Sequence, residues 1–508
     1  MRRALFLIAL VLGAPRVPAQ APVLRSLSSH LAFVANDTNG ARRTHWQFVA
    51  PTVRFTHNSA LPYSLNDGAL WAGRGASMDL TGGVSMRAGP VRLILVPELV
   101  VAANDSFARP DIYYNPPPPL PRSEYSSPFH GNGQSIDMPW RFGNAPIRQL
   151  YPGQSTAMVD VGLASIGVST ENEWWGPGMR NALVLSNHAP GFEHAFVRTR
   201  DPIATPLGNF GARWIVGTLR ESRYFDVDTS KLRSISLLAV TWTPRQDSGL
   251  VVGFARSVLA PSRRPIDALR DAWQVFADVG HPNARPYLDS TITPGRDQLF
   301  SLFLRWSFPK DGFETWAEWA RTEVPLSLRD FIIYPNHTQG YTLGLQWTGD
   351  TLRWNARLHA EAEFTFLEQS TTYRHREIGS WYTSRAVVQG YTNRGQSLGA
   401  AIGPGSSSQW IALDYVLPSW EVGLNLTRIR WMNDAMSQRD YGLSGWCQHD
   451  VSLLPGIRGA ARTRFGTVAM DYSAGWRINT FFENTSGCPT SPGRDENNKS
   501  LTIAFTPR

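Results

Sequence analysis

The chain has 508 residues, a formal net charge of +8 and only two cysteines, Cys447 and Cys488. Two cysteines are too few for a disulfide scaffold or a zinc ribbon, and whether they pair stays open. Beyond the N-terminal segment no run of about 18 apolar residues occurs, which excludes a transmembrane helix. The basic charge is mostly arginine, which suits capture of carboxylates and phosphates but is equally typical of an arginine-biased genome.

The N-terminus has the pattern of a secretory signal peptide over residues 1–19. Arg2 and Arg3 precede an apolar run and a small-residue exit that ends at Ala19. We predict cleavage after Ala19, an exported protein and a short periplasmic segment over 20–45. The alternative is a buried strand or helix of a cytoplasmic protein.

Residues 104–152 are predicted to form a long loop that covers or enters the folded domain over 46–508. Pro116 to Pro119 are consecutive and Pro121 lies just beyond. Proline lacks the backbone donor that a strand ladder needs, so a sheet does not tolerate this run.

The stretch from Thr170 to His194 combines paired tryptophans, acids, an arginine, amides and two histidines. One interpretation is a structural turn anchored by aromatic rings. The other is a sugar platform, because flat rings stack on sugar faces while Asn, Glu and Arg bind hydroxyls and carboxylates. The candidate ligand or plug contacts are Trp174, Trp175, Arg180, Asn181, Asn187 and His188.

Catalytic and metal-binding alternatives exist in the same stretch. Glu171 and Glu173 would share one face of a strand and could be a glycosidase pair. His188, Glu193 and His194 could ligate a metal, although spacing alone is weak evidence. Nucleophile-elbow, phosphate-loop and zinc-protease motifs do not occur. We therefore predict no catalytic residue, no metal and no cofactor, and a protein that is not an enzyme.

Residues 261–284 are predicted to hold one short amphipathic helix in a connecting loop. Ile266, Leu269, Trp273 and Phe276 follow helical spacing. An open loop is the alternative.

Later segments alternate between apolar and polar residues with period two, as strands do. Their apolar faces lie within 300–308, 341–347, 352–366 and 468–478, and the last strand of the chain is expected to end near Phe505. The polar residues of the third segment that we predict to line a lumen are Arg353, Arg357, His359, Glu361 and Glu363.

These strands are predicted to close into an antiparallel membrane barrel. They run to about ten residues or longer, as a tilted membrane strand requires, whereas strands of globular sheets typically have about 5–6. Aromatic residues such as Tyr341, Trp347 and Phe366 lie near the ends of the apolar faces, as interfacial girdles do. A soluble sandwich shows the same alternation, so length and aromatic placement decide for an all-β barrel over 46–508.

Three blocks resemble the capsule assembly Wzi family: Ser169–Phe196, Asn66–Gly75 and Gly390–Gly399. The flanks Leu150–Ser155 and Asp201–Gly208 are also similar. The resemblance covers the chain from about residue 61 to at least residue 405. It implies an outer-membrane barrel of about 18 strands, blocked as a channel, that acts as a surface lectin and attaches or organises capsular polysaccharide.

We therefore expect a non-catalytic outer-membrane protein that binds a capsular or exopolysaccharide at the cell surface. The arginines favour an acidic polysaccharide. We expect a monomer in contact with outer-membrane lipids and no nucleic-acid partner. A transport channel is the alternative, and an envelope glycoside hydrolase using Glu171 and Glu173 is a third hypothesis.

Overall fold

The computed structural model describes most of the chain outside its N-terminus and several loops. The described residues are 23–25, 44–108, 125, 129, 135–226, 231–277, 295–325, 327–374, 376, 378–435, 449–482 and 494–507. The predicted signal peptide, Cys447, Cys488 and the consecutive prolines lie outside these ranges. Among the described residues, no helix has the length and apolar character needed to cross a membrane.

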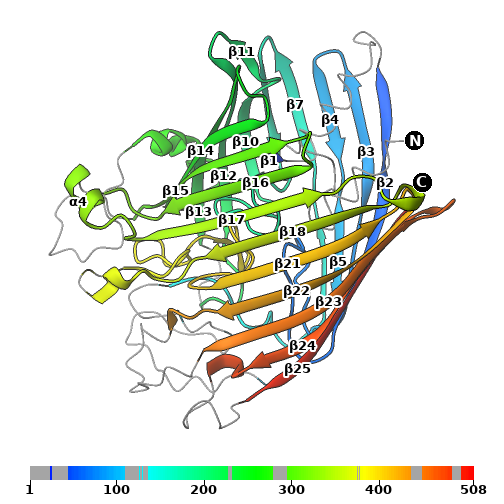
Figure 1. Ribbon diagram of the computed structural model, residues 1–508. Helices are drawn as coiled ribbons and strands as arrows, with labels where there is room; N and C mark the ends of the chain where they lie inside the picture. Colours follow the sequence, from blue (N-terminus) through cyan, green and yellow to red (C-terminus); the bar gives the residue numbers. More distant parts are fainter. Residues whose placement is uncertain are drawn as a thin grey trace.

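Most of the described strands form one closed antiparallel barrel (Figure 1). Strand β2 closes it by pairing with β25, from Val53 opposite Phe505 to Asn58 opposite Ser500. The segments β4 with β5, β6 with β7 and β10 with β11 are interrupted strands, so the described barrel has 18 strands. This confirms the predicted all-β, closed antiparallel barrel.

The barrel strands are β2 (His45–Asn58), β3 (Gly75–Ala88), β4 (Val91–Leu95), β5 (Glu98–Ala102), β6 (Ile147–Tyr151), β7 (Thr156–Val161), β8 (Ala164–Ser169), β10 (Glu193–Thr199), β11 (Ile203–Thr205), β12 (Gly208–Arg220), β13 (Leu232–Pro244), β14 (Leu250–Ser262), β15 (Asp297–Phe308), β16 (Phe313–Arg321), β17 (Gln339–Thr348), β18 (Arg357–Phe366), β21 (Ser407–Val416), β22 (Trp420–Trp431), β23 (Asp450–Arg462), β24 (Gly466–Ile478) and β25 (Glu496–Pro507).

Short elements accompany the barrel. Two small sheets pair β1 (Leu24–Arg25) with β9 (Trp174–Trp175) and β19 (Thr392–Asn393) with β20 (Gln396–Ser397). The helical elements are α3 (Asp267–Arg270), η1 (Ala272–Phe276), α4 (Leu328–Ile333), η2 (Arg353–Asn355), η3 (Thr371–Arg374) and η4 (Thr480–Phe482).

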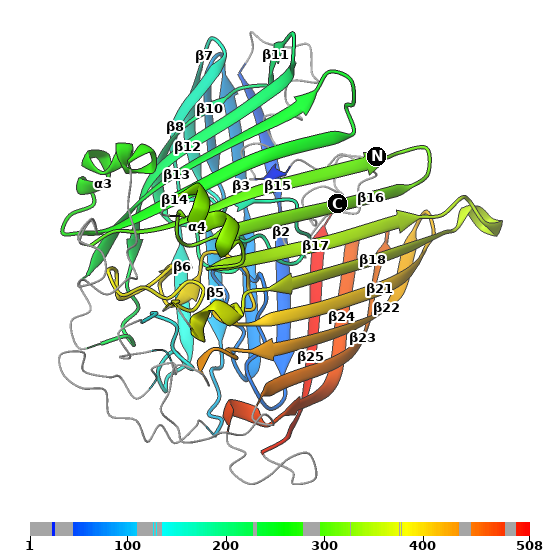
Figure 2. The same cartoon turned by 60° about the vertical axis from the view of Figure 1, so that its left-hand side comes forward.

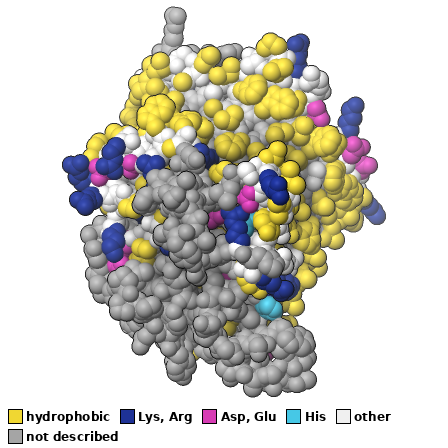
Figure 3. Space-filling model, turned by 90° about the vertical axis from the view of Figure 1, so that its left-hand side faces the viewer, with side chains coloured by type: hydrophobic (Ala, Val, Ile, Leu, Met, Phe, Trp, Pro, Cys, Tyr) yellow, Lys and Arg dark blue, Asp and Glu magenta, His cyan; other side chains and the backbone are white. Residues whose placement is uncertain are grey.

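Alternate side chains of each strand point out of the barrel and into its lumen. On β15 the exposed residues are Leu302, Leu304 and Trp306, and the alternate residues Ser301, Phe303 and Arg305 are buried. The same pattern holds on β17, β18 and β24, which confirms the predicted apolar faces. Hydrophobic side chains cover much of the outer wall in Figure 3. The apolar faces are therefore outside and the polar faces inside, the reverse of a soluble sandwich.

The long alternating segment begins later than predicted. Strand β18 starts at Arg357, because Trp354 and Asn355 adopt positive φ angles of 62° and 57° that turn the chain. Arg353 lies in this turn, exposed, with its guanidinium 4.8 Å from the Trp354 ring centroid. Arg353 therefore does not line the lumen. The apolar and polar residues keep alternating through this turn, so the sequence pattern does not reveal where the strand begins.

The two ends of the barrel differ in their connections. At the short-turn end, β3 to β4, β7 to β8 and β15 to β16 are joined by two to four residues. At the long-loop end, the connections run over 59–74, 103–146, 170–192, 263–296 and 367–406. His45 lies opposite Arg87 and Pro507 opposite Gly466, so the barrel begins and ends at the short-turn end.

Two predicted boundaries are wrong. Within the expected loop 104–152, Ile147–Tyr151 is strand β6, paired with β5. Within the expected periplasmic segment 20–45, β1 pairs with β9 inside the barrel, and the Gly176 N–H donates to Val23 O at 2.9 Å. Neither error is visible locally, because both segments gain their order from pairing with distant residues.

Candidate functional site

Three loops from the long-loop end fold into the lumen. We call them the first plug loop (59–74), the second plug loop (170–192) and the third plug loop (367–406, with 375 and 377 outside the described residues). Most of their side chains are buried, including Leu70, Trp175 and Leu398. Each contains most or all of one of the three blocks singled out from the sequence. The three blocks therefore meet in space.

The first and second plug loops are joined by hydrogen bonds. The Gly68 N–H donates to Asn187 O at 2.7 Å, and Asn66 Nδ2 donates to Arg180 O at 2.7 Å. Asn187 Nδ2 donates in turn to Asn66 O at 3.1 Å, and the Asn66 N–H donates to His188 Nδ1 at 3.4 Å. Asn66 has a φ of 60°, a conformation that asparagine tolerates better than most residues.

The second and third plug loops are joined in the same way. The Ser186 N–H donates to Leu398 O at 2.8 Å, and Gln396 Nε2 donates to His188 O at 2.8 Å. Because backbone groups carry much of this contact, the three loops behave as one plug.

Carboxylates of the barrel wall hold the second plug loop. Glu363 of β18 accepts the backbone N–H groups of residues 179–181 at 2.5 to 3.1 Å. Glu318 of β16 accepts the Leu183 N–H at 3.1 Å. Gly176 has a φ of 137°, and a Cβ there would lie 2.6 Å from Glu318 Oε2, so this position requires glycine. Glu363, predicted from the sequence to line a lumen, anchors the second plug loop.

Arginines of the wall hold the other two loops. Arg54 of β2 donates from Nη1 to Asp67 Oδ1 at 2.9 Å in the first plug loop. Arg233 of β13 donates from Nη1 to Gly390 O at 2.7 Å in the third. Each plug loop is thus attached to the wall by a buried charged side chain, which fixes its place in the lumen.

The paired tryptophans lie inside the plug. Trp175 is 0% exposed and donates from Nε1 to Glu173 Oε2 at 3.1 Å. Trp174 is buried as well and donates from Nε1 to Gly178 O at 3.0 Å, with the Arg25 guanidinium 5.4 Å from its ring centroid. Their placement matches a turn anchored by aromatic rings, and neither presents a free face for sugar stacking.

The two candidate catalytic glutamates share an ion pair. Arg213 Nη2 donates to Glu171 Oε1 at 3.0 Å and also to Glu173 Oε1. All three side chains are buried. In a glycosidase one carboxyl group protonates the leaving oxygen, and the other attacks the sugar or activates a water molecule. Two buried carboxylates that bind the same guanidinium are not arranged for these two roles.

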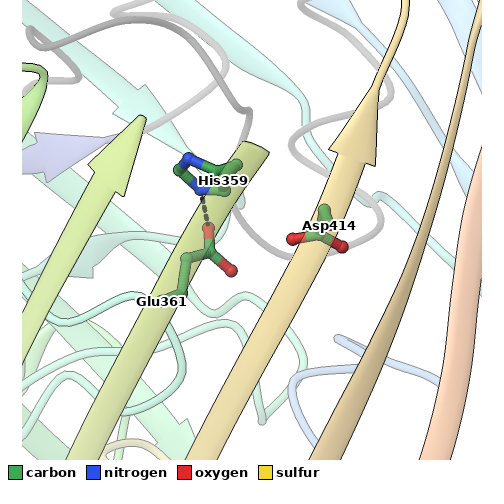
Figure 4. Close-up of side chains that lie close together, drawn as sticks. All are labelled: His359, Glu361 and Asp414. Atoms are coloured by element: carbon green, nitrogen blue, oxygen red, sulfur yellow. Dashed lines mark hydrogen bonds and ion pairs between the residues drawn. The ribbon is translucent and has the colours of Figure 1, made fainter. Parts of the chain in front are cut away.

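A different group of possible metal ligands lies on the lumen wall (Figure 4). Oxygen and nitrogen atoms of His359 and Glu361 on β18 and Asp414 on β21 lie within 4.8 Å of one another. Arg458 Nη2 donates to Glu361 Oε2 at 2.7 Å and to Asp414 Oδ2 at 2.6 Å. The Arg458 guanidinium already occupies an oxygen atom of each carboxylate, so we assign no metal here. His359 and Glu361 are buried on β18, whereas Arg357 is exposed at the short-turn end.

A narrow crevice lies between the plug and the wall beside Arg180, and most of the residues that line it are buried. The Arg180 guanidinium lies 4.9 Å from the Trp410 ring centroid, and Arg458 lies 4.8 Å from the same ring. The polar and aromatic residues that line it are Asn66, Arg180, Asn181, Glu363, Ser408, Trp410 and Thr427. Of the six candidates from the sequence, Arg180 and Asn187 are partly exposed and the others are buried.

Sequence reasoning missed Trp410. The residue lies on the inward face of β21, where Ser408 and Asp414 share its parity. A large aromatic residue among polar lumen positions is a usable signal, because the outward face is where such residues are expected.

Acid is expected to weaken the plug through His188. Burial lowers the pKa of His188 to about 4, against about 6.5 in an unfolded chain. Between these values the unfolded chain binds more protons, so this contribution to stability is complete above pH 6.5 and is lost as pH falls to about 4. The expected loss is about 1.4 kcal/mol per pH unit. Unfolding of wild type and His188→Gln at pH 7 and pH 5 measures it; equal pH slopes would contradict the prediction.

No family model matches the chain, and no curated protein matches it by sequence. By structure, the chain is similar to Wzi of Escherichia coli, described as an outer membrane protein involved in group 1 capsule assembly and a carbohydrate-binding β-barrel. The TM-score is 0.57 at 11% identity, over 97% of this chain and 95% of that one.

Two porin-type structures are more distant. OccK5 of Pseudomonas aeruginosa has a TM-score of 0.41 at 11% identity, over 91% of this chain and 98% of that one. A BenF-like porin of Pseudomonas fluorescens has a TM-score of 0.42 at 6% identity, over 92% and 100%. At these identities, likeness shows the fold alone, and membership of the family that the three blocks resemble stays a prediction.

Proposed function

We propose that this protein is an outer-membrane barrel, closed by its plug, that binds an acidic polysaccharide of the cell surface without catalysis. The observation that carries the proposal is the plug itself. Three loops from one end are bonded to one another and anchored to the wall by Glu363, Arg54 and Arg233. A conducting pore needs an open lumen, whereas a binding protein gains from a rigid one.

The exterior supports the membrane location. Its strands carry outward apolar residues such as Leu302, Leu343 and Phe364, all exposed. Outer-membrane barrels have short periplasmic turns and longer extracellular loops. By this rule the plug loops enter from the extracellular side, so the plug belongs to the surface of the cell.

The crevice beside Arg180 has the chemistry for an acidic sugar. A guanidinium binds a carboxylate through two parallel hydrogen bonds. Asn181, Ser408 and Thr427 lie buried behind it, so the partly exposed Arg180 is the residue proposed to contact the sugar. The carbohydrate-binding barrel of Escherichia coli has a similar fold, and the plug loops contain the three blocks that resemble its family.

Transport remains the second candidate, because the lumen wall carries charges. Arg458, Asp414 and Glu361 form an ion-pair network on β18, β21 and β23. Rows of lumen charges also occur in pores. The two functions differ in conductance.

Glycan retention and conductance test the proposal together. Wild type is expected to be retained on polygalacturonate but not on neutral dextran, and to give no steady conductance in planar bilayers. Arg180→Gln is expected to weaken retention about tenfold, the effect of losing one charge-assisted hydrogen bond. Arg200→Gln, which removes the same charge at the short-turn end, is the matched control.

The outcomes separate the candidates. Equal retention of both variants on polygalacturonate would contradict a ligand site at Arg180. A steady open conductance of the wild type would favour transport over binding. Release of reducing sugar from the polysaccharide would favour an enzyme, which the buried Glu171 and Glu173 do not support.

A further inference from the structure

Two helical segments of the long loops lie against the outside of the barrel. Ala268 and Ala272 of the α3–η1 segment pack on Val216 of β12, and the rings of Trp273 and Trp214 lie 4.8 Å apart. Trp214 and Val216 alternate with the inward residues of β12, so they point outward. The predicted amphipathic helix therefore covers the wall and does not enter the lumen.

The wall beneath α3–η1 carries polar side chains beside Val216 and Trp214. Ser234 Oγ donates to Asp271 Oδ2 at 2.6 Å, and Ser236 Oγ donates to Ala272 O at 2.6 Å. Arg256 Nη1 donates to the carbonyl of Val275 at 3.0 Å. The segment accepts hydrogen bonds from these outward side chains, which fix its position on the wall.

The opposite face of this segment is apolar and open. Ile266, Leu269, Trp273 and Phe276 are 59%, 56%, 67% and 55% exposed. These are the residues predicted from helical spacing, and each is more than half exposed although Trp273 also contacts Trp214. Isolated exposed leucines are common on proteins, but a stripe of four large apolar side chains is not. The stripe therefore indicates a contact with a partner.

Helix α4 repeats the arrangement farther around the barrel. Phe331 packs edge-on against Trp319, an outward residue of β16, with ring centroids 6.2 Å apart. Leu328, Ile332 and Ile333 on α4 are exposed. Figures 1 and 2 both place α4 on the same side of the barrel as α3, toward the long loops. Exposed apolar residues therefore occur on both helical segments.

We propose that α3–η1 and α4 form a shelf that binds anionic lipids of the outer leaflet. The apolar residues would lie in the acyl boundary, continuous with the outward faces of β12 to β17. Amphipathic helices with an apolar face and flanking arginines bind membranes in this way. The proposal rests on the membrane location proposed above, but not on polysaccharide binding.

Arginines next to the stripe suit phosphate headgroups. The Arg264 and Arg270 side chains are 74% and 68% exposed. Their ion pairs with the buried carboxylates of Asp267 and Asp271, both at 3.3 Å, leave most of each guanidinium group in solvent, where a phosphate can reach it. A cation near an anionic surface gains about 1 kcal/mol.

Spin-label accessibility tests the shelf. Leu269→Cys, in a chain carrying Cys447→Ser and Cys488→Ser, is labelled and placed in phosphatidylglycerol vesicles. The label is expected to collide more with oxygen than with a water-soluble nickel chelate. Leu302→Cys on the lipid-facing side of β15 and Asp247→Cys in a short turn are the lipid and water references.

Each outcome decides between occupants. A Leu269→Cys label that behaves like the Asp247→Cys reference overturns the shelf, and dipolar broadening between labels would assign the face to a second copy instead. If the Leu302→Cys reference is itself exposed to the chelate, the membrane location fails.

Should the cysteine variants not fold, lipid retention in native mass spectrometry replaces them. Arg264→Gln with Arg270→Gln should lower retention of phosphatidylglycerol about fivefold or more and leave phosphatidylcholine unchanged; equal loss of both lipids overturns the proposal.

Discussion

Replacing Arg213 by methionine is expected to lower the free energy of unfolding by about 3–5 kcal/mol. The guanidinium is the shared partner of Glu171 and Glu173, and all three side chains are buried between the plug and the wall. Removing one partner of a buried ion pair leaves uncompensated charge in a medium that solvates it poorly. Unfolding of the protein in vesicles by the denaturant guanidinium chloride, followed by tryptophan fluorescence, measures the loss.

Arg220→Met on the same strand is the matched control. Its ion pair with Glu193 is exposed, with side-chain accessibilities of 37% and 49%, so its loss should cost less than about 1 kcal/mol. Adding Glu171→Gln and Glu173→Gln to Arg213→Met should restore part of the stability, because the uncompensated charges are then gone. Equal effects of Arg213→Met and Arg220→Met would show that burial does not govern these pairs.

Replacing Trp175 by alanine is expected to cost about 3–5 kcal/mol of stability and to loosen the plug. The ring is fully buried, and the backbone N–H of Trp175 donates to Leu185 O at 2.9 Å. Truncation leaves a cavity that a loop bonded on several sides cannot close. Hydrogen exchange at the backbone amides of Trp175 and Ser186 should accelerate relative to amides of the barrel strands.

Two further variants separate packing from ligand contact. Trp273→Ala removes an exposed ring of the same type, and the stability in detergent should change little. Trp175→Phe keeps most of the packing but loses the indole bond to Glu173, and an intermediate effect is expected. If Trp175→Ala weakens glycan retention with unchanged exchange in the plug, the ring contacts the sugar directly and the assignment to the plug is wrong.

The barrel could be predicted because strand parity is a local property. Each outward residue of β15 or β17 is two positions from the next, so inspection of ten residues is enough to find the face. The errors have the opposite cause. Leu352 to Ala356 keep the parity through a turn, and β6 and β1 are ordered by partners that are far away in the sequence.

The sequence indicated the segments that form the plug but not the contacts between them. The three blocks marked positions that matter, but their contact depends on the closure of the barrel around them. Glu363 lay among predicted lumen residues, and nothing in its neighbours indicates that it accepts three N–H groups more than 180 residues distant. The same holds for the pairing of Arg180 with Trp410.

By itself, the sequence determined the two faces of each strand, because alternation is a local property, and strand length and aromatic placement favoured a membrane barrel over a soluble sandwich. Only the tertiary structure decided what the tryptophan motif does. A ring that is free to stack on a sugar and a ring that fills a plug have the same neighbours in the chain, and they differ only in what surrounds them. Burial depends on every loop that meets at the site, so Trp175 became a core residue and Arg180 the accessible one.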